Sequence, residues 1–108
     1  MNPKILFWIL VSTGAVLEII GDIFFKKWSI ENKSILIWIG FLVYFAGTVF
    51  WAFSLKYEVL SKSISIFTIL NLVILTLVGV IFFKEDISFL SKIGILLGIV
   101  SIIFIELG

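Results

Sequence analysis

Four long apolar stretches, separated by short polar connectors, constrain the fold of this chain more than any other feature. They run from Ile5 to Phe25, from Ile35 to Leu55, from Ile64 to Phe83 and from Leu90 to Ile105. A helix needs roughly 20 apolar residues to cross a bilayer, with about 17–25 as the usual range. The first three stretches are long enough, and the fourth is if the Lys92 side chain reaches the headgroups. We therefore expect an all-α membrane protein with four transmembrane helices.

The composition supports the same class. Of the 108 residues, 62% are hydrophobic and only 14% are charged, whereas soluble domains are about 45–50% apolar. The connectors leave no room for a soluble domain, so residues 1–108 are expected to form one domain. A net charge of +1 argues against nucleic acid as a partner. With no cysteine, no histidine and no nucleophile–base pair or phosphate loop, we expect no metal, no cofactor and no enzymatic activity.

Glu18 lies near the middle of the first apolar stretch. A charge at that depth costs roughly 3 kcal/mol on insertion scales, so such a residue faces a protein interior or a wet cavity. Glu18 is therefore a titratable group that can hold either a proton or a cationic solute. The structural alternative is a protonated Glu18 bonded to a neighbour. Asp22 falls on the same helical face, where it either joins this site or pairs with Lys26.

Further polar and aromatic residues lie within the second and third stretches. Tyr44, Thr48 and Trp51 share one helical face at i, i+4 and i+7, and aromatic faces attract organic cations by about 2 kcal/mol or more when desolvated. Asn71 is mid-span, so it is expected to bond across helices or to face the cavity. The candidate proton- and substrate-binding residues are Glu18, Asp22, Tyr44, Trp51 and Asn71.

Glycines offer surfaces on which helices can approach closely. Gly94 and Gly98 are four residues apart, and Ser101 continues their stripe. Two further pairs, each seven residues apart, are Gly14 with Gly21 and Gly40 with Gly47. Small residues permit close packing in membranes, although glycine is also simply common there. Four helices enclose little space, so we expect a dimer with a transport cavity between two chains.

The lysines give a weak topology signal. The side with the N-terminus and the second connector has Lys4, Lys56 and Lys62, and the opposite side has Lys26, Lys27, Lys33, Lys84 and Lys92. Because lysines gather on the cytoplasmic side of membrane proteins, a count of three against five weakly favours a topology with both termini outside. A nearly even count is also what a chain inserted in both orientations would show.

Several of these residues together resemble one family. They are the stretch from Ala15 to Gly21 around Glu18, Lys26, Tyr44, the sequence Phe82-Phe83-Lys84-Glu85, and the stripe Gly94, Leu97, Gly98 and Ser101. In these residues the chain resembles the small multidrug resistance family, and the resemblance extends over nearly its full length. That family comprises dimeric four-helix proton-coupled exporters within the drug/metabolite transporter superfamily.

The resemblance implies roles for particular residues. Glu18 would bind both protons and substrate in each subunit, and Tyr44 would line the site. The fourth-helix stripe would form the dimer contact between antiparallel protomers, either two copies of this chain or this chain and a paralogue. The location implied is the cell's inner (cytoplasmic) membrane, with lipids as neighbours. The residues expected to line the site are Gly14, Ala15, Gly21, Thr48 and Phe67.

The chain also departs from the family pattern. Exporters of quaternary ammonium and guanidinium compounds carry a tyrosine, a tryptophan and a Gly-x-Gly hinge in the third helix. Here those positions are Ile64, Phe67, Ile69 and Asn71. Asp22 stands where the family usually has a small hydroxyl residue.

The prediction is a proton-coupled exporter of small organic cations, in which two acids on one face favour a substrate such as a polyamine. The first alternative is a subunit like the lipid-linked sugar flippases of the same superfamily. The second is a membrane subunit without transport that pairs with a partner protein through Glu18.

Overall fold

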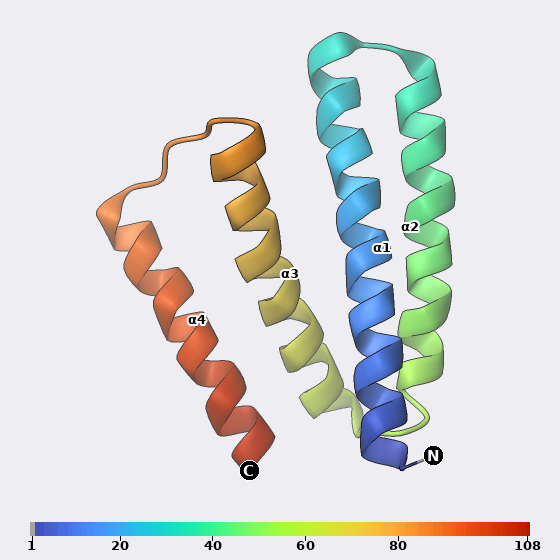
Figure 1. Cartoon of the computed structure of the whole chain (residues 1–108), viewed down its shortest axis with the longest axis vertical. Coiled ribbons are helices and arrows are strands. Elements are labelled where there is room, and N and C mark those ends of the chain that lie inside the picture. The colour runs from blue at the N-terminus through green and yellow to red at the C-terminus, as the bar shows by residue number, and fades with distance from the viewer. Residues whose placement is uncertain (1) are drawn as a thin grey trace. The chain divides into compact units, whose positions relative to one another are not determined.

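The computed structural model describes residues 2–108, and these form four α-helices that are long and apolar enough to cross a membrane (Figure 1). They are α1 (Pro3–Glu31), α2 (Ser34–Ser54), α3 (Leu60–Phe82) and α4 (Phe89–Leu107). The predicted all-α fold with four spans is confirmed.

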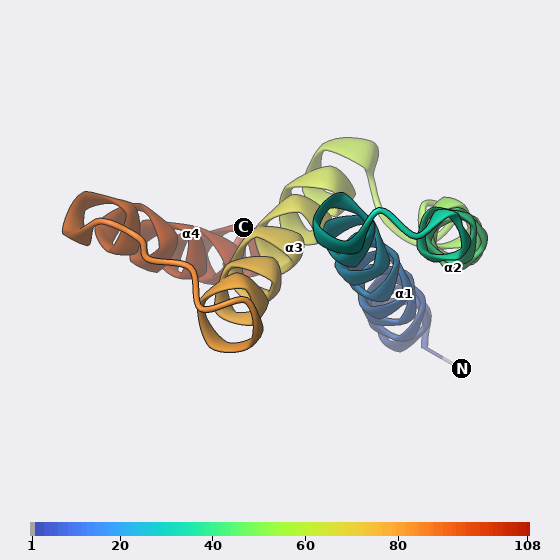
Figure 2. The same cartoon turned by 90° about the horizontal axis from the view of Figure 1, so that it is seen from above.

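The chain divides into two compact units, of which the first ends at Ser63 and the second begins at Ile64. The first unit contains α1 and α2, which run antiparallel and lie side by side in both ribbon views (Figures 1 and 2). The second contains most of α3 together with α4, again antiparallel. That the whole chain forms one domain stays a prediction.

The helices extend further than the apolar stretches do. The residues from Lys26 onward, predicted to form a connector, continue α1 as far as Glu31, and α3 already begins at Leu60. Backbone hydrogen bonding does not stop where the apolar residues do, because lysine is a good helix former. α1 ends at Glu31 and is capped by Asn32, whose φ of 57° is left-handed and whose N–H donates to the Trp28 carbonyl. Asparagine tolerates this conformation better than most residues.

Two pairs of glycines bring α1 and α2 together. A Cβ placed on Gly47 would lie 2.8 Å from the Gly14 carbonyl oxygen, and one on Gly21 would lie 3.0 Å from the Gly40 carbonyl oxygen. Gly14 therefore faces Gly47 and Gly21 faces Gly40, and the two pairs are seven positions apart on each helix. These four glycines, which the sequence offered for close packing in general, are used inside the chain to join α1 to α2.

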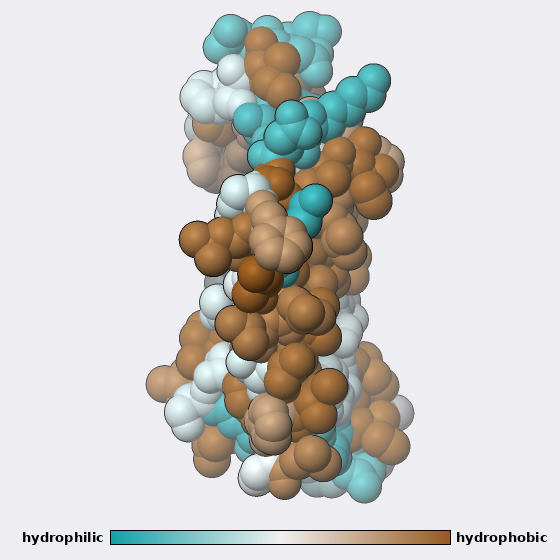
Figure 3. Space-filling model, turned by 90° about the vertical axis from the view of Figure 1, so that its left-hand side faces the viewer, coloured by the Kyte–Doolittle hydropathy of each residue, from teal (hydrophilic) through white to brown (hydrophobic). Residues whose placement is uncertain are grey.

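The remaining surface suits a lipid environment. No residue of α4 between Phe89 and Leu107 is buried, and its large apolar side chains, such as Leu97 and Phe104, are exposed. Figure 3 shows a face that is hydrophobic along most of its length, with hydrophilic residues gathered toward its ends. A surface of this kind is stable against lipid tails and unstable against water.

We expect Gly47→Ala to loosen the α1–α2 hairpin. The new methyl group would meet backbone atoms at 2.8–2.9 Å, and overpacking of this kind costs about 1–3 kcal/mol. The matched control is Gly94→Ala, since a Cβ on Gly94 meets nothing within 4 Å. Denaturation by increasing dodecyl sulfate, followed by circular dichroism, measures both. Equal stability of the two variants would contradict the role given to the glycine pairs.

Candidate functional site in the first unit

Glu18 is buried in the α1–α2 hairpin. Only 6% of its surface is exposed, although it lies in the middle of an apolar helix. The side chains of Tyr44 and Thr48 on α2 are its hydrogen-bonding partners, and Asp22 lies near enough to act on it electrostatically. Asp22, Tyr44 and Thr48 are therefore neighbours of Glu18, and that they form a binding site with it stays a prediction.

The glycines make room for this carboxylate. A Cβ on Gly47 would lie 2.8 Å from Cγ of Glu18, so a glycine is what permits the Glu18 side chain to pass there. Gly21 does the same for Tyr44, whose Cβ and backbone nitrogen would lie 3.0 and 3.1 Å from a Cβ at position 21. Close approach of the two helices therefore sets both the position of Glu18 and the position of its tyrosine partner.

The partners of Glu18 suit either protonation state. The Thr48 hydroxyl donates to the Tyr44 carbonyl at 3.1 Å, and a hydroxyl can both donate and accept. When Glu18 is ionised, the Tyr44 hydroxyl can donate to it, and the Thr48 hydroxyl can do so by turning its hydrogen away from the Tyr44 carbonyl. When Glu18 is protonated, the same oxygens can accept its proton in a hydrogen bond. The site can therefore hold Glu18 in two forms without rearranging its backbone.

An aromatic cluster borders the site. Phe25 of α1 contacts Phe41 and Tyr44 of α2, with ring centroids 5.3 and 5.9 Å apart, and Trp38 extends the cluster to Phe41 at 5.8 Å. Sequence reasoning missed Phe25, although its position seven residues after Glu18 placed it on the same helical face. Its ring packs against the Tyr44 ring, and aromatic pairs of this kind contribute about 0.5–1.5 kcal/mol.

Other predicted residues are placed less directly. Ala15 is buried on α1, and the backbone nitrogen of Trp51 would lie 3.1 Å from a Cβ on Gly14. Asn71 and Phe67 belong to α3 in the second unit, so their part in the Glu18 site stays a prediction. Asn71 was expected to bond across helices or to face a cavity, whereas its Nδ2 donates to the Phe67 carbonyl of its own helix at 2.9 Å.

The α4 stripe is partly open. A Cβ on Gly94 would meet nothing within 4 Å, and Leu97 is 61% exposed. Gly98 instead faces α3, because its Cβ would lie in ordinary contact with Leu72 and Ile69 at 3.6 and 3.7 Å. The Ser101 hydroxyl donates to the Leu97 carbonyl of its own helix. Gly94 and Leu97 are therefore the stripe residues best placed to meet another chain.

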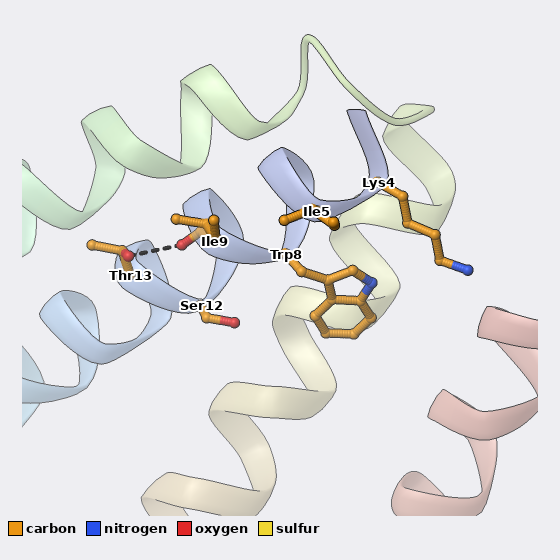
Figure 4. Close-up of a pocket in the computed structure, with 6 residues that line it drawn as sticks. All are labelled: Lys4, Ile5, Trp8, Ile9, Ser12 and Thr13. Atoms are coloured by element: carbon orange, nitrogen blue, oxygen red, sulfur yellow. Dashed lines mark hydrogen bonds between the residues drawn. The ribbon is translucent and has the colours of Figure 1, made fainter. Parts of the chain in front are cut away.

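A separate hollow of about 610 Å³ lies along the first half of α1 (Figure 4). Its lining includes Lys4, Trp8 and Ser12, and the Thr13 hydroxyl donates to the Ile9 carbonyl at 2.7 Å. None of the lining residues is acidic, so this hollow has no group that would attract a cation. The carboxylates of Glu18 and Asp22 remain the better candidate site for a cation.

Within residues 2–108 no cluster of three or more histidine, cysteine, aspartate or glutamate side chains is arranged to hold a metal ion.

Comparison with known proteins identifies a family. Residues 6–99 match the family model described as Small Multidrug Resistance protein. That match covers both units and includes Glu18, Asp22 and Tyr44. No curated protein matches the chain, and no solved structure does.

We expect Tyr44→Phe to destabilise the hairpin by about 1–3 kcal/mol, because it leaves a buried carboxyl group without one of its partners. In a Glu18→Gln background the same change should cost less. The coupling between the two positions is then about 0.5–3 kcal/mol in a double-mutant cycle of unfolding free energies. Tyr57→Phe, in the connector after α2, serves as the control and should be additive with Glu18→Gln. Additivity of Tyr44→Phe as well would contradict the Glu18–Tyr44 contact.

Proposed function

The chain belongs to the small multidrug resistance family of membrane transporters, and on this premise we propose that it exports small organic cations in exchange for protons. Glu18 is the shared binding site for the proton and the substrate. Tyr44, Thr48 and Trp51 line that site together with Gly14, Ala15 and Gly21.

One observation carries this proposal. Glu18 is almost fully buried, and the residues that act on it are Tyr44, Thr48 and Asp22, none of which carries a positive charge. An ionised carboxylate without a compensating charge is unstable away from water. The site is therefore most stable when it holds a proton or a cation.

Competition for Glu18 is sufficient to couple the two fluxes. A cation that binds the ionised carboxylate displaces the proton, and a proton displaces the cation. Coupling then requires only that both loaded forms can switch orientation across the membrane. Raising the pH removes the competing proton, so cation binding should tighten with pH until Glu18 is fully ionised. Lowering the pH should release the cation.

Asp22 adjusts the choice of substrate. It lies one helical turn from Glu18 and acts electrostatically on both Glu18 and Tyr44. Two acids on one face favour a substrate whose positive charge is doubled or spread along a chain, such as a polyamine, over a bulky aromatic monocation. Aromatic rings at Tyr44 and Trp51 contribute cation–π attraction to either kind of substrate.

The transporting unit is a dimer, either of two copies or with a paralogue, and its protomers are antiparallel. The stripe of Gly94, Leu97, Gly98 and Ser101 provides its α4 contact through Gly94 and Leu97, because Gly98 faces α3 of its own chain, and the open space beside Gly94 supports this assignment. The nearly even lysine count on the two sides supports insertion in both orientations. A multi-pass protein of this kind is assigned to the cell's inner membrane. The family match favours transport over the flippase-like subunit and over the non-transporting subunit.

We predict that Glu18→Gln abolishes proton release on substrate addition, because glutamine cannot ionise. The measurement is the pH change of lightly buffered detergent solution after addition of a cation from a panel that includes monocations and polyamines. Glu58→Gln is the matched control, since Glu58 lies in the connector after α2 and pairs with Lys62 at 3.8 Å. That variant should release protons as the wild type does. Equal release from Glu18→Gln and wild type would refute the proposal.

The same assay separates the two acids. Asp22→Asn should keep proton release while shifting the affinity and its pH dependence, with a larger loss for dications than for monocations. Complete loss of release in Asp22→Asn, with Glu18 intact, would assign the coupling role to Asp22 instead.

We predict that Gly94→Leu weakens the dimer by about 1–3 kcal/mol, since overpacking a close helix contact has that effect. The new side chain has open space within its own chain, so the protomer itself should fold. Leu96→Ala, on the other side of α4, is the control and should leave the dimer unchanged. Cross-linking yield and light scattering in detergent measure the outcome. A Gly94→Leu variant that dimerises like wild type would show that this stripe is not the contact.

A further inference from the structure

A groove runs along the seam between α3 and α4, within the second unit, and encloses about 310 Å³. One face of α3, from Val73 to Val80, forms one wall, and one face of α4, from Lys92 to Ile99, forms the other. Ile87 of the connector lies at the same end as Lys92. This volume falls at the lower end of the range of small-molecule sites, about 300–1,000 Å³.

The walls suit an apolar occupant. Val73, Val80, Ile95 and Ile99 are β-branched, so their side chains are stiff and do not readily turn inward to fill the groove. The one hydroxyl in the lining belongs to Thr76, and it already donates to the Leu72 carbonyl at 2.6 Å. The walls therefore offer a hydrocarbon surface and little hydrogen bonding.

The connector holds this end of the seam open. The Glu85 N–H donates to the Gly79 carbonyl at 3.1 Å, and Lys84 takes a left-handed φ of 53°. At the other end of the connector, the Ser88 hydroxyl accepts from the Ser91 N–H at 3.1 Å. Both ends are thus fixed, and the residues between them separate the end of α3 from the start of α4, as Figure 1 shows.

Lys92 is the one charged residue in the lining of this apolar groove. It lies in the first turn of α4, where the helix dipole disfavours a cation. Within the residues that the structure describes, its ammonium group forms no salt bridge. From Lys92 to Ile99 the helix rises about 10 Å, so the groove continues from the lysine toward the middle of the membrane. An anionic group at the lysine and a hydrocarbon chain below it would complement both parts.

We propose that this groove binds an anionic phospholipid, with one acyl chain between α3 and α4 and the headgroup phosphate at Lys92. The site is separate from the Glu18 site and does not depend on it. A second copy of the chain is the competing occupant. Gly94 borders the same seam, in an adjoining hollow that it shares with Ile95 and Thr76, whereas Leu97 and Ser101 lie about 200° around α4 from Ile95 and Ile99. The charge of Lys92 favours the lipid, and the experiments below distinguish it from a second copy.

Native mass spectrometry of the purified protein tests this proposal, with phosphatidylglycerol and phosphatidylcholine of identical acyl chains as probes. Wild type should bind phosphatidylglycerol about fivefold more tightly, the ratio expected for one interfacial lysine. Lys92→Gln should remove that preference. Lys84→Gln, in the connector but outside the groove, should keep it. Equal binding of the two lipids by wild type, or equal effects of the two lysine variants, would overturn the proposal.

A second pair of measurements locates the lipid. Ile95→Trp fills the groove and should weaken binding of both lipids while leaving substrate-induced proton release unchanged. A photoreactive residue at Ile99, irradiated in phosphatidylglycerol vesicles, should label lipid. Labelling of a second copy of the chain would show that protein fills the groove, and would exclude the lipid.

Discussion

The close approach of α1 and α2 at two glycine pairs is the constraint on which the Glu18 site depends. Gly47 leaves the space through which the Glu18 side chain passes, and Gly21 leaves the space that the Cβ and backbone nitrogen of Tyr44 need. If the two helices did not pack closely enough to exclude lipid, a carboxylate at this depth would face hydrocarbon. Its insertion there is unfavourable by several kcal/mol. Packing between two backbones, more than any single hydrogen bond, makes a polar site possible in so apolar a hairpin.

The site that results is chemically incomplete. One further carboxylate and two hydroxyls lie around Glu18, and none of these groups supplies the positive charge that would balance the two acids. Hydroxyls that donate as readily as they accept allow the same pocket to hold a protonated or an ionised carboxyl group. A transporter needs this property, since its binding group must remain stable with either ligand and must not retain one of them permanently.

The sequence predicts much of this arrangement and fails at identifiable points. Apolar length alone predicts four spans, and the i, i+4 spacing places Glu18 with Asp22 and Tyr44 with Thr48. The length of the apolar stretch does not predict that α1 continues to Glu31, because a helix does not have to end where its residues stop being apolar. Nor does the sequence show which glycines face one another, because pairing depends on the register between helices. Nor does it show that the Asn71 amide donates one hydrogen bond to a carbonyl of its own helix, an option that polar side chains on a helix have.

The unequal lengths of the helices link the site to the thickness of the bilayer. With 29 residues α1 is about 43 Å long, and α4 with 19 residues is about 28 Å long, against a hydrocarbon core of about 30 Å. α4 therefore spans without tilting, whereas α1 tilts or extends its last turns among the headgroups. Lys26 and Lys27 begin those turns, so extension keeps their charges in water. Because α1 is unbroken from Glu18 to its end, a thinner or thicker membrane changes the angle at which the carboxylate is presented.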